Sequence, residues 1–338
     1  MRIKSIIPLI FLISVFACTG HLSDTYFKNG IAKYALGDYN GALSEYTKAI
    51  KYNSEYVEAY YNRGLAKGAL GDSMGAISDY TKAIKYNPVY TDAYIARANA
   101  RFSFGDYKSA LADYNKVSEI NPGNTLILFK RGIAKSRLHD FKGALADYDR
   151  AIQNNQESAM MYSERGMTKL NMGDFQGAID DMTKVIDLNP DDPEAYITRG
   201  QAKEGHLQFR EAIEDYNKAI EINPSAAATY FLRGVARSKS ADFINAILDF
   251  NKAIEISPGE ATYFYYRSMC KIETGDFIGA LKDADSALDG KSDFADAVLA
   301  RATAEYKLGN YSAACIDFRK AAEMGSDKAY EAMKKYCN

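Results

Sequence analysis

The residue types that usually carry catalysis are present in this 338-residue chain but are not grouped for it. The histidines are His21, His139 and His206, which lie more than sixty residues apart and have no nucleophile or second metal ligand at a catalytic spacing. The glycines recur at regular intervals or lie near the chain ends, so they form no phosphate-binding loop. We therefore expect no enzyme activity, no cofactor and no metal ion.

The overall charge also excludes one class of partner. The chain is 47% hydrophobic and 25% charged, which is typical of a folded protein, and its formal net charge is -2. Nucleic-acid binding usually requires a basic face, and this balance predicts none. We therefore expect no nucleic-acid partner.

An arginine followed sixteen residues later by an aspartate is the one chemical pair that recurs. The pairs are Arg63 and Asp79, Arg97 and Asp113, Arg131 and Asp147, Arg165 and Asp181, Arg199 and Asp215, Arg233 and Asp249, Arg267 and Asp283, and Arg301 and Asp317. A ladder of arginines could bind an anionic ligand. However, the two residues vary together, because Asn29 and Glu45 replace both at the start of the chain. Since a partly buried arginine without a carboxylate would be costly, we interpret the pairs as structural links between helices.

These pairs belong to a period of 34 residues. Small residues recur at Gly30, Gly64, Ala98, Gly132, Gly166, Gly200, Gly234, Ser268 and Ala302. Twelve residues after each comes an alanine, from Ala42 to Ala314, and four residues further comes a large side chain in all but one case, Ala284. Such self-similarity at a fixed period is typical of repeat architectures.

Each 34-residue unit predicts two amphipathic helices. The small residue and the alanine let the two backbones approach closely, and the large residue one turn later fills the space beside them. Gly-Asp pairs such as Gly71-Asp72 favour the end of the first helix and the start of the second. The second helix is stopped by a proline at five repeat ends, at Pro88, Pro122, Pro190, Pro224 and Pro258.

This pattern resembles the tetratricopeptide repeat, with Tyr or Phe in place of the usual first-helix Trp, as at Tyr60, and Arg in place of Leu, as at Arg63. The resemblance implies an all-α fold, a right-handed superhelical solenoid of nine helix pairs, and residues 327–338 predict a C-terminal capping helix. We expect repeats over 23–328, at 23–56, 57–90, 91–124, 125–158, 159–192, 193–226, 227–260, 261–294 and 295–328.

The resemblance further implies a concave groove that is lined by the first helices and holds a segment of a partner protein. The principal groove candidates are Phe27, Lys28, Tyr34, Tyr61, Asn62, Ile95, Asn99, Phe102, Phe129, Lys130, Arg137, Tyr265 and Tyr266, with Ile31, Leu65, Ile133, Glu164, Met167, Asn171, Ile197, Gln201, Glu204, Phe231, Lys239, Met269 and Glu273 beside them. Several of these residues have packing between repeats as their alternative role. The two-carboxylate clamp of chaperone-binding members is absent, because in no first helix is a Lys followed four residues later by an Asn.

Residues 1–17 predict an export signal. Arg2 and Lys4 precede an apolar run from Ile6 to Phe16, which is too short to span a bilayer comfortably. The end of the run resembles a bacterial lipobox, which implies lipidation at Cys18, followed by a linker over 18–22. The alternative is ordinary cleavage after Ala17. The first predicts an outer-membrane lipoprotein facing the periplasm, and the second a soluble periplasmic or secreted protein.

Export favours disulfides, and the end of the chain offers one. Cys315 and Cys337 lie ten and twelve residues from a turn near Gly325, so an antiparallel helical hairpin would bring them together. Closing that loop is worth on the order of 3 kcal/mol. The alternative is two unpaired thiols. Cys270 stands where most repeats have Ala, so we interpret it as a small core residue.

The sequence therefore predicts a scaffold of the bacterial cell envelope that binds a protein or peptide segment in its groove. The alternative function is binding of cell-wall glycan, or service as an accessory subunit of an envelope enzyme, because aromatic grooves also stack on sugar rings.

Overall fold

The computed structural model describes the backbone of residues 7–155 and 158–337, with side chains from His21 onward. Throughout these described residues the regular elements are helices, without a strand, which confirms the all-α prediction. The chain divides into two compact units, which are unit 1 (Met1–Gln156) and unit 2 (Glu157–Asn338).

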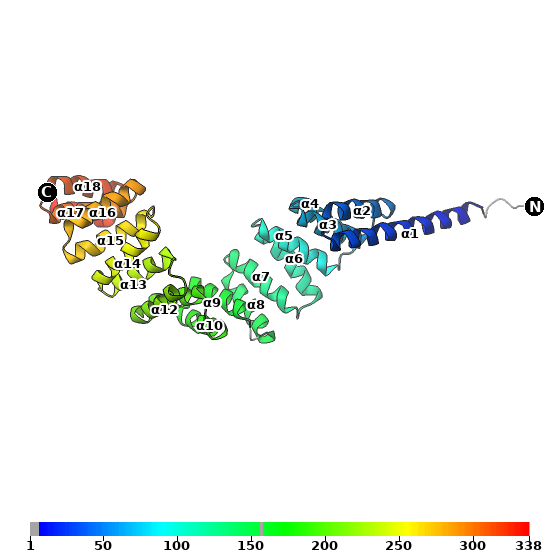
Figure 1. Ribbon diagram of the computed structural model, residues 1–338, viewed down its shortest axis with the longest axis horizontal. Coiled ribbons are helices and arrows are strands. Elements are labelled where there is room, and N and C mark those ends of the chain that lie inside the picture. Colours follow the sequence, from blue (N-terminus) through cyan, green and yellow to red (C-terminus); the bar gives the residue numbers. More distant parts are fainter. Residues whose placement is uncertain (1–6, 156–157, 338) are drawn as a thin grey trace, which may run out of the picture. The chain divides into compact units, whose positions relative to one another are not determined.

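Unit 1 contains four helix pairs, and each odd-numbered helix packs against the even-numbered helix that follows it (Figure 1). The helices are α1 (Ile7–Ala35), α2 (Tyr39–Tyr52), α3 (Val57–Ala69), α4 (Ser73–Tyr86), α5 (Thr91–Ser103), α6 (Tyr107–Ile120), α7 (Thr125–Arg137) and α8 (Phe141–Asn154).

Unit 2 contains five further pairs and a final helix that packs on α18. Its helices are α9 (Ala159–Met172), α10 (Phe175–Leu188), α11 (Pro193–Gly205), α12 (Phe209–Ile222), α13 (Ala227–Lys239), α14 (Phe243–Ile256), α15 (Ala261–Thr274), α16 (Phe277–Gly290), α17 (Ala295–Lys307), α18 (Tyr311–Glu323) and α19 (Asp327–Tyr336). Nine pairs and a C-terminal helix are the arrangement that the repeats predicted.

The turn within each pair has the predicted chemistry. Gly71 has a φ of +85°, which favours glycine, and the Asp72 side chain accepts a 2.8 Å hydrogen bond from the Gly75 backbone N–H at the start of α4. Three equivalents of Gly71 are His139, Leu207 and Ala241, which adopt positive φ without being glycine. The turn is therefore fixed by the packing of the pair as well as by its residue type.

Close packing of the first and second helices depends on the small residues. A Cβ atom added to Gly64 would lie 2.5 Å from Cε1 of Tyr80, a separation that real Cβ atoms do not show. Tyr80 and Ala76 are both buried. The small residue, the alanine and the large side chain therefore meet as the period predicted.

The Arg and Asp pairs are internal links, as the sequence predicted. Arg199 donates from Nε and Nη2 to the two carboxylate oxygens of Asp215, at 3.0 and 2.7 Å. Its Nη1 donates to Thr183 of the preceding pair at 3.1 Å, and Lys203 lies 2.8 Å from the same Asp215 carboxylate. One arginine thus links α10, α11 and α12. In the first repeat, Glu45 takes the place of the aspartate and pairs with Lys33 and Lys48.

The C-terminal helix covers the last pair. Ala329 of α19 is fully buried, and Met333 packs on the cluster around Phe318. Cys315 and Cys337 form a disulfide with Cα atoms 5.6 Å apart, which places them as the hairpin argument predicted. Cys270 is a free thiol that is 1% exposed, in the core between α14 and α15.

The export signal and the Cys18 side chain lie outside the residues whose side chains the structure describes. The backbone of α1 begins at Ile7 and runs through residues 18–22 into the first repeat. Within the described part of the chain, no helix combines the length and apolar character that a membrane span requires. Cleavage and lipidation therefore stay predictions.

Candidate functional site

Two neighbouring pockets lie on the first helices of unit 1. The α3–α5 pocket has a volume of about 350 Å³ and is lined by Tyr61, Leu65, Tyr80, Asp92, Ile95, Ala96 and Asn99. The α5–α7 pocket has a volume of about 360 Å³ and is lined by Asn99, Phe102, Ser103, Tyr114, Lys130 and Ile133. Asn99 belongs to both, so the pockets are adjacent along α5. We call them together the unit 1 groove.

The helix pattern explains why these side chains converge. Ile95, Asn99 and Phe102 lie at i, i+4 and i+7 of α5 and therefore share one face of that helix. Tyr80 and Tyr114 are the large residues of α4 and α6, whose rings reach between the first helices to the pocket floor. The groove thus has first-helix walls and a tyrosine floor.

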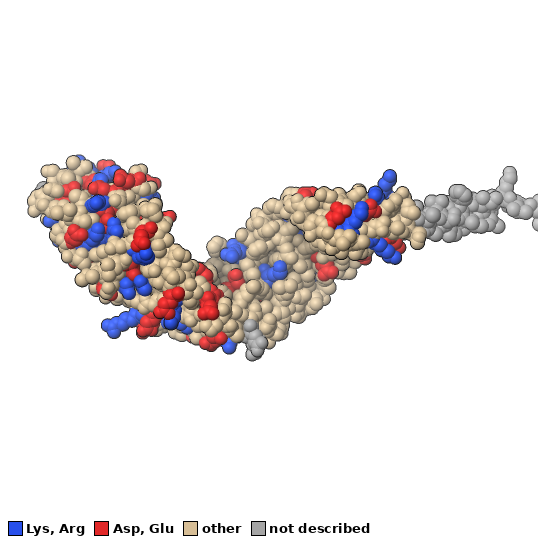
Figure 2. Space-filling model, in the orientation of Figure 1, with Lys and Arg blue, Asp and Glu red and all other residues tan. Residues whose placement is uncertain are grey.

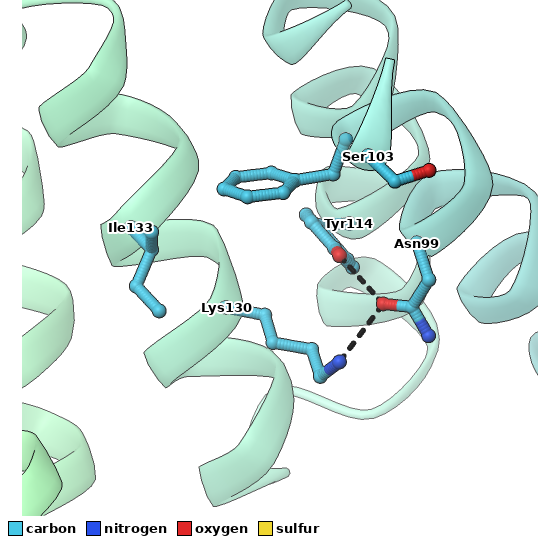
Figure 3. A pocket seen from close by; sticks show the side chains of 6 residues that line it. Asn99, Ser103, Tyr114, Lys130 and Ile133 are labelled. Atoms are coloured by element: carbon cyan, nitrogen blue, oxygen red, sulfur yellow. Dashed lines mark hydrogen bonds between the residues drawn. The ribbon is translucent and has the colours of Figure 1, made fainter. Parts of the chain in front are cut away.

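The polar centre of the α5–α7 pocket is the amide oxygen of Asn99. Tyr114 Oη and Lys130 Nζ both donate to Asn99 Oδ1, at 2.8 and 2.9 Å. Figure 3 shows Lys130 and Ile133 on α7 facing Asn99 and Ser103 on α5, with Tyr114 between them. Burial raises the pKa of Tyr114 to about 12 and lowers the pKa of the Lys130 ammonium. Both effects come from the low polarity of this pocket.

Apolar walls surround these polar groups. Phe102 packs against the buried cluster that contains Tyr114 and Ile127, and its ring meets Tyr107 edge-on at 4.9 Å. Apolar walls with a few convergent polar groups are typical of binding sites for peptides and small molecules. Nothing in the unit 1 groove resembles a nucleophile with its base.

Five of the principal groove candidates meet in the unit 1 groove: Tyr61, Ile95, Asn99, Phe102 and Lys130. The others lie outside the two pockets. Lys28 and Arg137 are exposed, and the Asn62 side chain donates to the Glu58 carbonyl of its own helix at 2.8 Å.

The remaining aromatic candidates pack on neighbouring rings. The contacts join Phe27 to Tyr46 and Tyr56, Tyr34 to Tyr39, Tyr265 to Tyr266 and Phe294, and Tyr266 to Phe231 and Phe250. These rings are half-buried, and their packing between repeats is the alternative role that the sequence left open.

Two groove candidates were wrong. Phe129 is only 6% exposed and packs on Tyr148, with ring centroids 5.9 Å apart, because its side chain fills the space between α7 and α8. Glu204 is also buried, and it accepts a 2.6 Å hydrogen bond from Tyr216 Oη and pairs with Lys239 at 3.0 Å. A first-helix position therefore does not guarantee exposure to the groove.

Five groove residues were missed by sequence reasoning: Tyr80, Asp92, Ala96, Ser103 and Tyr114. Tyr80 and Tyr114 are the large residue of the period, which predicts a core position, and both are buried rings that also line the pockets. The sequence did contain a signal for these two tyrosines. Phe250 occupies the equivalent position in another repeat, so the core needs only a large ring there, and a tyrosine in unit 1 adds a hydroxyl that packing does not require.

Another cavity, of about 490 Å³, lies in unit 2 between α11 and α12, on the side of the charged pairs. Its lining includes Arg199, Asp215 and Lys218. Arg199 and Asp215 bind each other, and Lys218 pairs with Glu221 at 2.6 Å. These charges satisfy one another, so this cavity is a weaker candidate than the unit 1 groove.

The visible faces of the two units differ in charge. In Figure 2 the face of unit 1 over α5–α8 shows few charged side chains, whereas that of unit 2 shows many of both signs. Among the residues that the structure describes, no three His, Cys, Asp or Glu side chains are grouped to hold a metal ion.

Family models match most of the repeat region. A model described as TPR repeat matches residues 30–71 and 208–240. A model described as tetratricopeptide repeat matches residues 64–125, 129–193 and 271–329, and a second of that description matches 227–260. Comparison with curated protein sequences gave no match.

Solved tetratricopeptide structures share the fold. The C-terminal part of a TPR repeat-containing protein from Cytophaga hutchinsonii is 20% identical, with a TM-score of 0.60 over 71% of this chain and 98% of that one. A protein from Parabacteroides merdae is 20% identical, with a TM-score of 0.54 over 74% and 99%. YrrB, described as a TPR protein with an unusual peptide-binding site, is 24% identical, with a TM-score of 0.50 over 54% and 95%.

Repeat spacing, paired helices and family models agree. Proteins of this family are typically non-catalytic scaffolds for protein–protein interaction. The chain belongs to the tetratricopeptide repeat family.

Proposed function

We propose that this protein is a scaffold of the bacterial cell envelope, and that its unit 1 groove binds a segment of a partner protein. The observation that carries the proposal is the pair of adjacent pockets that share Asn99. Their aromatic and aliphatic walls would supply binding energy, and Asn99, Lys130 and Asp92 would set the register of the segment.

The leader sequence and the disulfide support the choice of compartment. The leader has a basic start, a short apolar run and Cys18 after a lipobox-like stretch. The disulfide between Cys315 and Cys337 suits an oxidising compartment. We propose that Cys18 is lipidated and anchors the protein to the outer membrane, facing the periplasm.

The anchor is tested by intact mass and membrane fractionation of the protein from its native host. We expect a mature chain that begins at Cys18, carries acyl mass and sediments with the outer membrane. A chain that begins at Cys18 without added mass would make the protein soluble in the periplasm or secreted, and the anchor proposal would be wrong.

The groove is tested by placing a photocrosslinking amino acid at Ile95 or Ile133 in those cells, with Ile244 as the control. Ile95 and Ile133 line the groove, whereas Ile244 is 70% exposed on α14 of unit 2. We expect the same protein adduct from both groove positions and none from the control.

Cell-wall fragments test the alternative function, which is glycan binding. Soluble glycan strands and muropeptides should neither bind the purified protein nor compete with the crosslink, because the pockets alternate apolar and charged groups. Binding of glycan strands that is lost in Tyr61→Ala would instead support the glycan alternative. Equal adducts from all three positions would contradict the groove assignment.

A further inference from the structure

The two pockets of the unit 1 groove contain charges of opposite sign. Lys130 lines the α5–α7 pocket and Asp92 lines the α3–α5 pocket, with the neutral amide of Asn99 shared between them. Neither charge belongs to the ladder of structural pairs. The inference below rests on the proposed function, because it concerns the segment that the groove binds.

Lys130 has no carboxylate partner among the described residues. Its ammonium donates to the neutral Asn99 Oδ1, whereas Arg131 and Lys135 on the same helix both pair with Asp147. The Lys130 side chain is half-buried, and burial lowers its pKa. A desolvated cation that faces only neutral dipoles costs folding free energy, and an anion brought by a ligand would offset that cost.

Asp92 is the matching case in the neighbouring pocket. It is exposed in the first turn of α5 and forms no ion pair among the described residues. The Asp92 carboxylate lies close enough to Tyr61 and Tyr90 to affect their titration. Burial raises the pKa of both phenols, and the negative charge of Asp92 raises each pKa further. The helix dipole stabilises an acidic residue in the first turn, which accounts for an aspartate at this position of α5. The dipole does not account for its place at the rim of a pocket.

The alternation of the two charges would define a direction for any bound chain. We propose that the groove binds a segment with an acidic side chain in the α5–α7 pocket and a basic side chain in the α3–α5 pocket. Asn99 lies between them, and its amide nitrogen donates no hydrogen bond within the described part of the chain, so it is available to a backbone carbonyl of the segment. Because the pockets are adjacent, both side chains belong to one short stretch of sequence. A segment in the reverse orientation would place like charges together, which disfavours binding.

The test is selection of random peptides displayed on phage by the immobilised full-length protein. Four proteins are compared: the wild type, Lys130→Glu, Asp92→Lys and the control Lys108→Glu. Lys108 is exposed on α6 and lies outside the pockets, so Lys108→Glu changes the charge by the same amount away from the groove. Far-UV circular dichroism verifies that each variant is folded.

We expect wild-type selections to contain Asp or Glu at one position and Lys or Arg at another, in a fixed order. Lys130→Glu should convert the acidic position to a basic one and leave the other unchanged, and Asp92→Lys should do the reverse. The control should select as the wild type does. If Lys130→Glu fails to fold, Lys130→Met should abolish the acidic preference without creating a basic one.

A synthetic consensus peptide separates the two sources of a carboxylate. Replacing its acidic side chain with the amide should weaken binding tenfold or more, while amidation of its C-terminus should have no effect. If C-terminal amidation alone abolishes binding, the pocket binds the C-terminal carboxylate of the peptide, and the proposed side-chain assignment is wrong.

The remaining outcomes distinguish this inference from the proposed function. Peptides that are selected equally by all four proteins, without charged positions, would overturn the charge inference and leave groove binding intact. If no peptide is enriched by any of the four proteins, groove binding of protein segments is contradicted as well.

Discussion

At the scale of single residues, the arginine ladder fixes how consecutive repeats join. Each arginine holds a buried aspartate of its own pair, as Arg199 does with Asp215, and Arg199 also reaches Thr183 of the pair before it. Asp215 is 3% exposed, and Arg199 and Lys203 together balance its buried charge. The ladder is therefore internal structure, which leaves the uncommitted charges of the unit 1 groove for binding.

The last repeat breaks this rule and gives a test of it. Glu305 stands where Lys203, Lys271 and their equivalents supply the second cation, and one of its carboxylate oxygens is buried without a hydrogen-bond partner. We predict that Glu305→Lys raises the free energy of unfolding by about 1–2 kcal/mol, since it removes an unsatisfied oxygen and gives Asp317 a second cation.

Urea unfolding followed by circular dichroism measures this change. The matched control is Glu323→Lys, an equal charge change at an exposed position of α18, which should stay within about 0.5 kcal/mol of the wild type. Destabilisation by Glu305→Lys would mean that the carboxylate has a role which the pairing rule does not describe.

At the scale of elements, the approach of two helices depends on glycines whose roles differ within one helix. In α3, a Cβ atom at Gly64 would meet the Tyr80 ring at 2.5 Å, whereas one at Gly68 would have its nearest neighbour at 4.0 Å. Gly64→Ala should therefore lower the free energy of unfolding by about 1–3 kcal/mol through overpacking.

Gly68→Ala is the internal control, and it should raise the free energy of unfolding by up to about 1 kcal/mol because alanine favours the helix. Chemical denaturation of both variants measures the two changes in the free energy of unfolding. Equal effects of the two substitutions would show that helix propensity outweighs packing at this contact.

The final helix is a second element whose stability has an identifiable source. The disulfide between Cys315 and Cys337 ties α18 to the end of α19, which covers the Phe318 cluster. Replacing both cysteines with alanine should lower the free energy of unfolding by about 3 kcal/mol. It should also raise the hydrogen exchange of α19, and this variant should not respond to a reducing agent. Hydrogen exchange in α19 that matches the wild type would show that packing alone holds the cap.

At the scale of the whole molecule, the two units have different compositions. Met1–Gln156 contains 20 Lys and Arg against 14 Asp and Glu, whereas Glu157–Asn338 contains 22 against 30. Tyrosine is the large second-helix residue throughout unit 1, at Tyr46, Tyr80, Tyr114 and Tyr148, whereas Met, Tyr, Phe and Ala share that position in unit 2. The groove with a polar floor is thus a property of unit 1.

Separate production of the units tests this division. In repeat proteins each repeat contacts mainly its neighbours, so residues 21–156 and 157–338 should each give a helical circular dichroism spectrum and a cooperative unfolding transition. The first fragment should keep the affinity of the whole chain for a groove-binding peptide, and the second should have none. Binding by the second fragment alone would move the site to unit 2.

Much of this architecture was predictable because its causes are local or strictly periodic. Helix ends follow from residues such as Gly71 and Asp72, and helix contacts follow from the spacing of Gly64, Ala76 and Tyr80, which repeats nine times with little variation. Phe129 shows the limit, because its helix position fits a groove residue while its side chain turns into the core. Exposure depends on the neighbouring helices, which a repeat pattern does not specify.

The sequence by itself determined the all-α fold, the nine pairs, the arginine links and the cysteines that meet at the cap, because each depends on fixed spacings along the chain. Tertiary structure decided which of the groove candidates meet in one site. Asn99, Tyr114 and Lys130 come from three helices, and they meet because packing of α5, α6 and α7 brings them within 3 Å of one oxygen atom. Packing also leaves Lys130 without a carboxylate partner among the described residues, whereas Arg131 and Lys135 both pair with Asp147. Such burial and pairing are properties of the assembled helices.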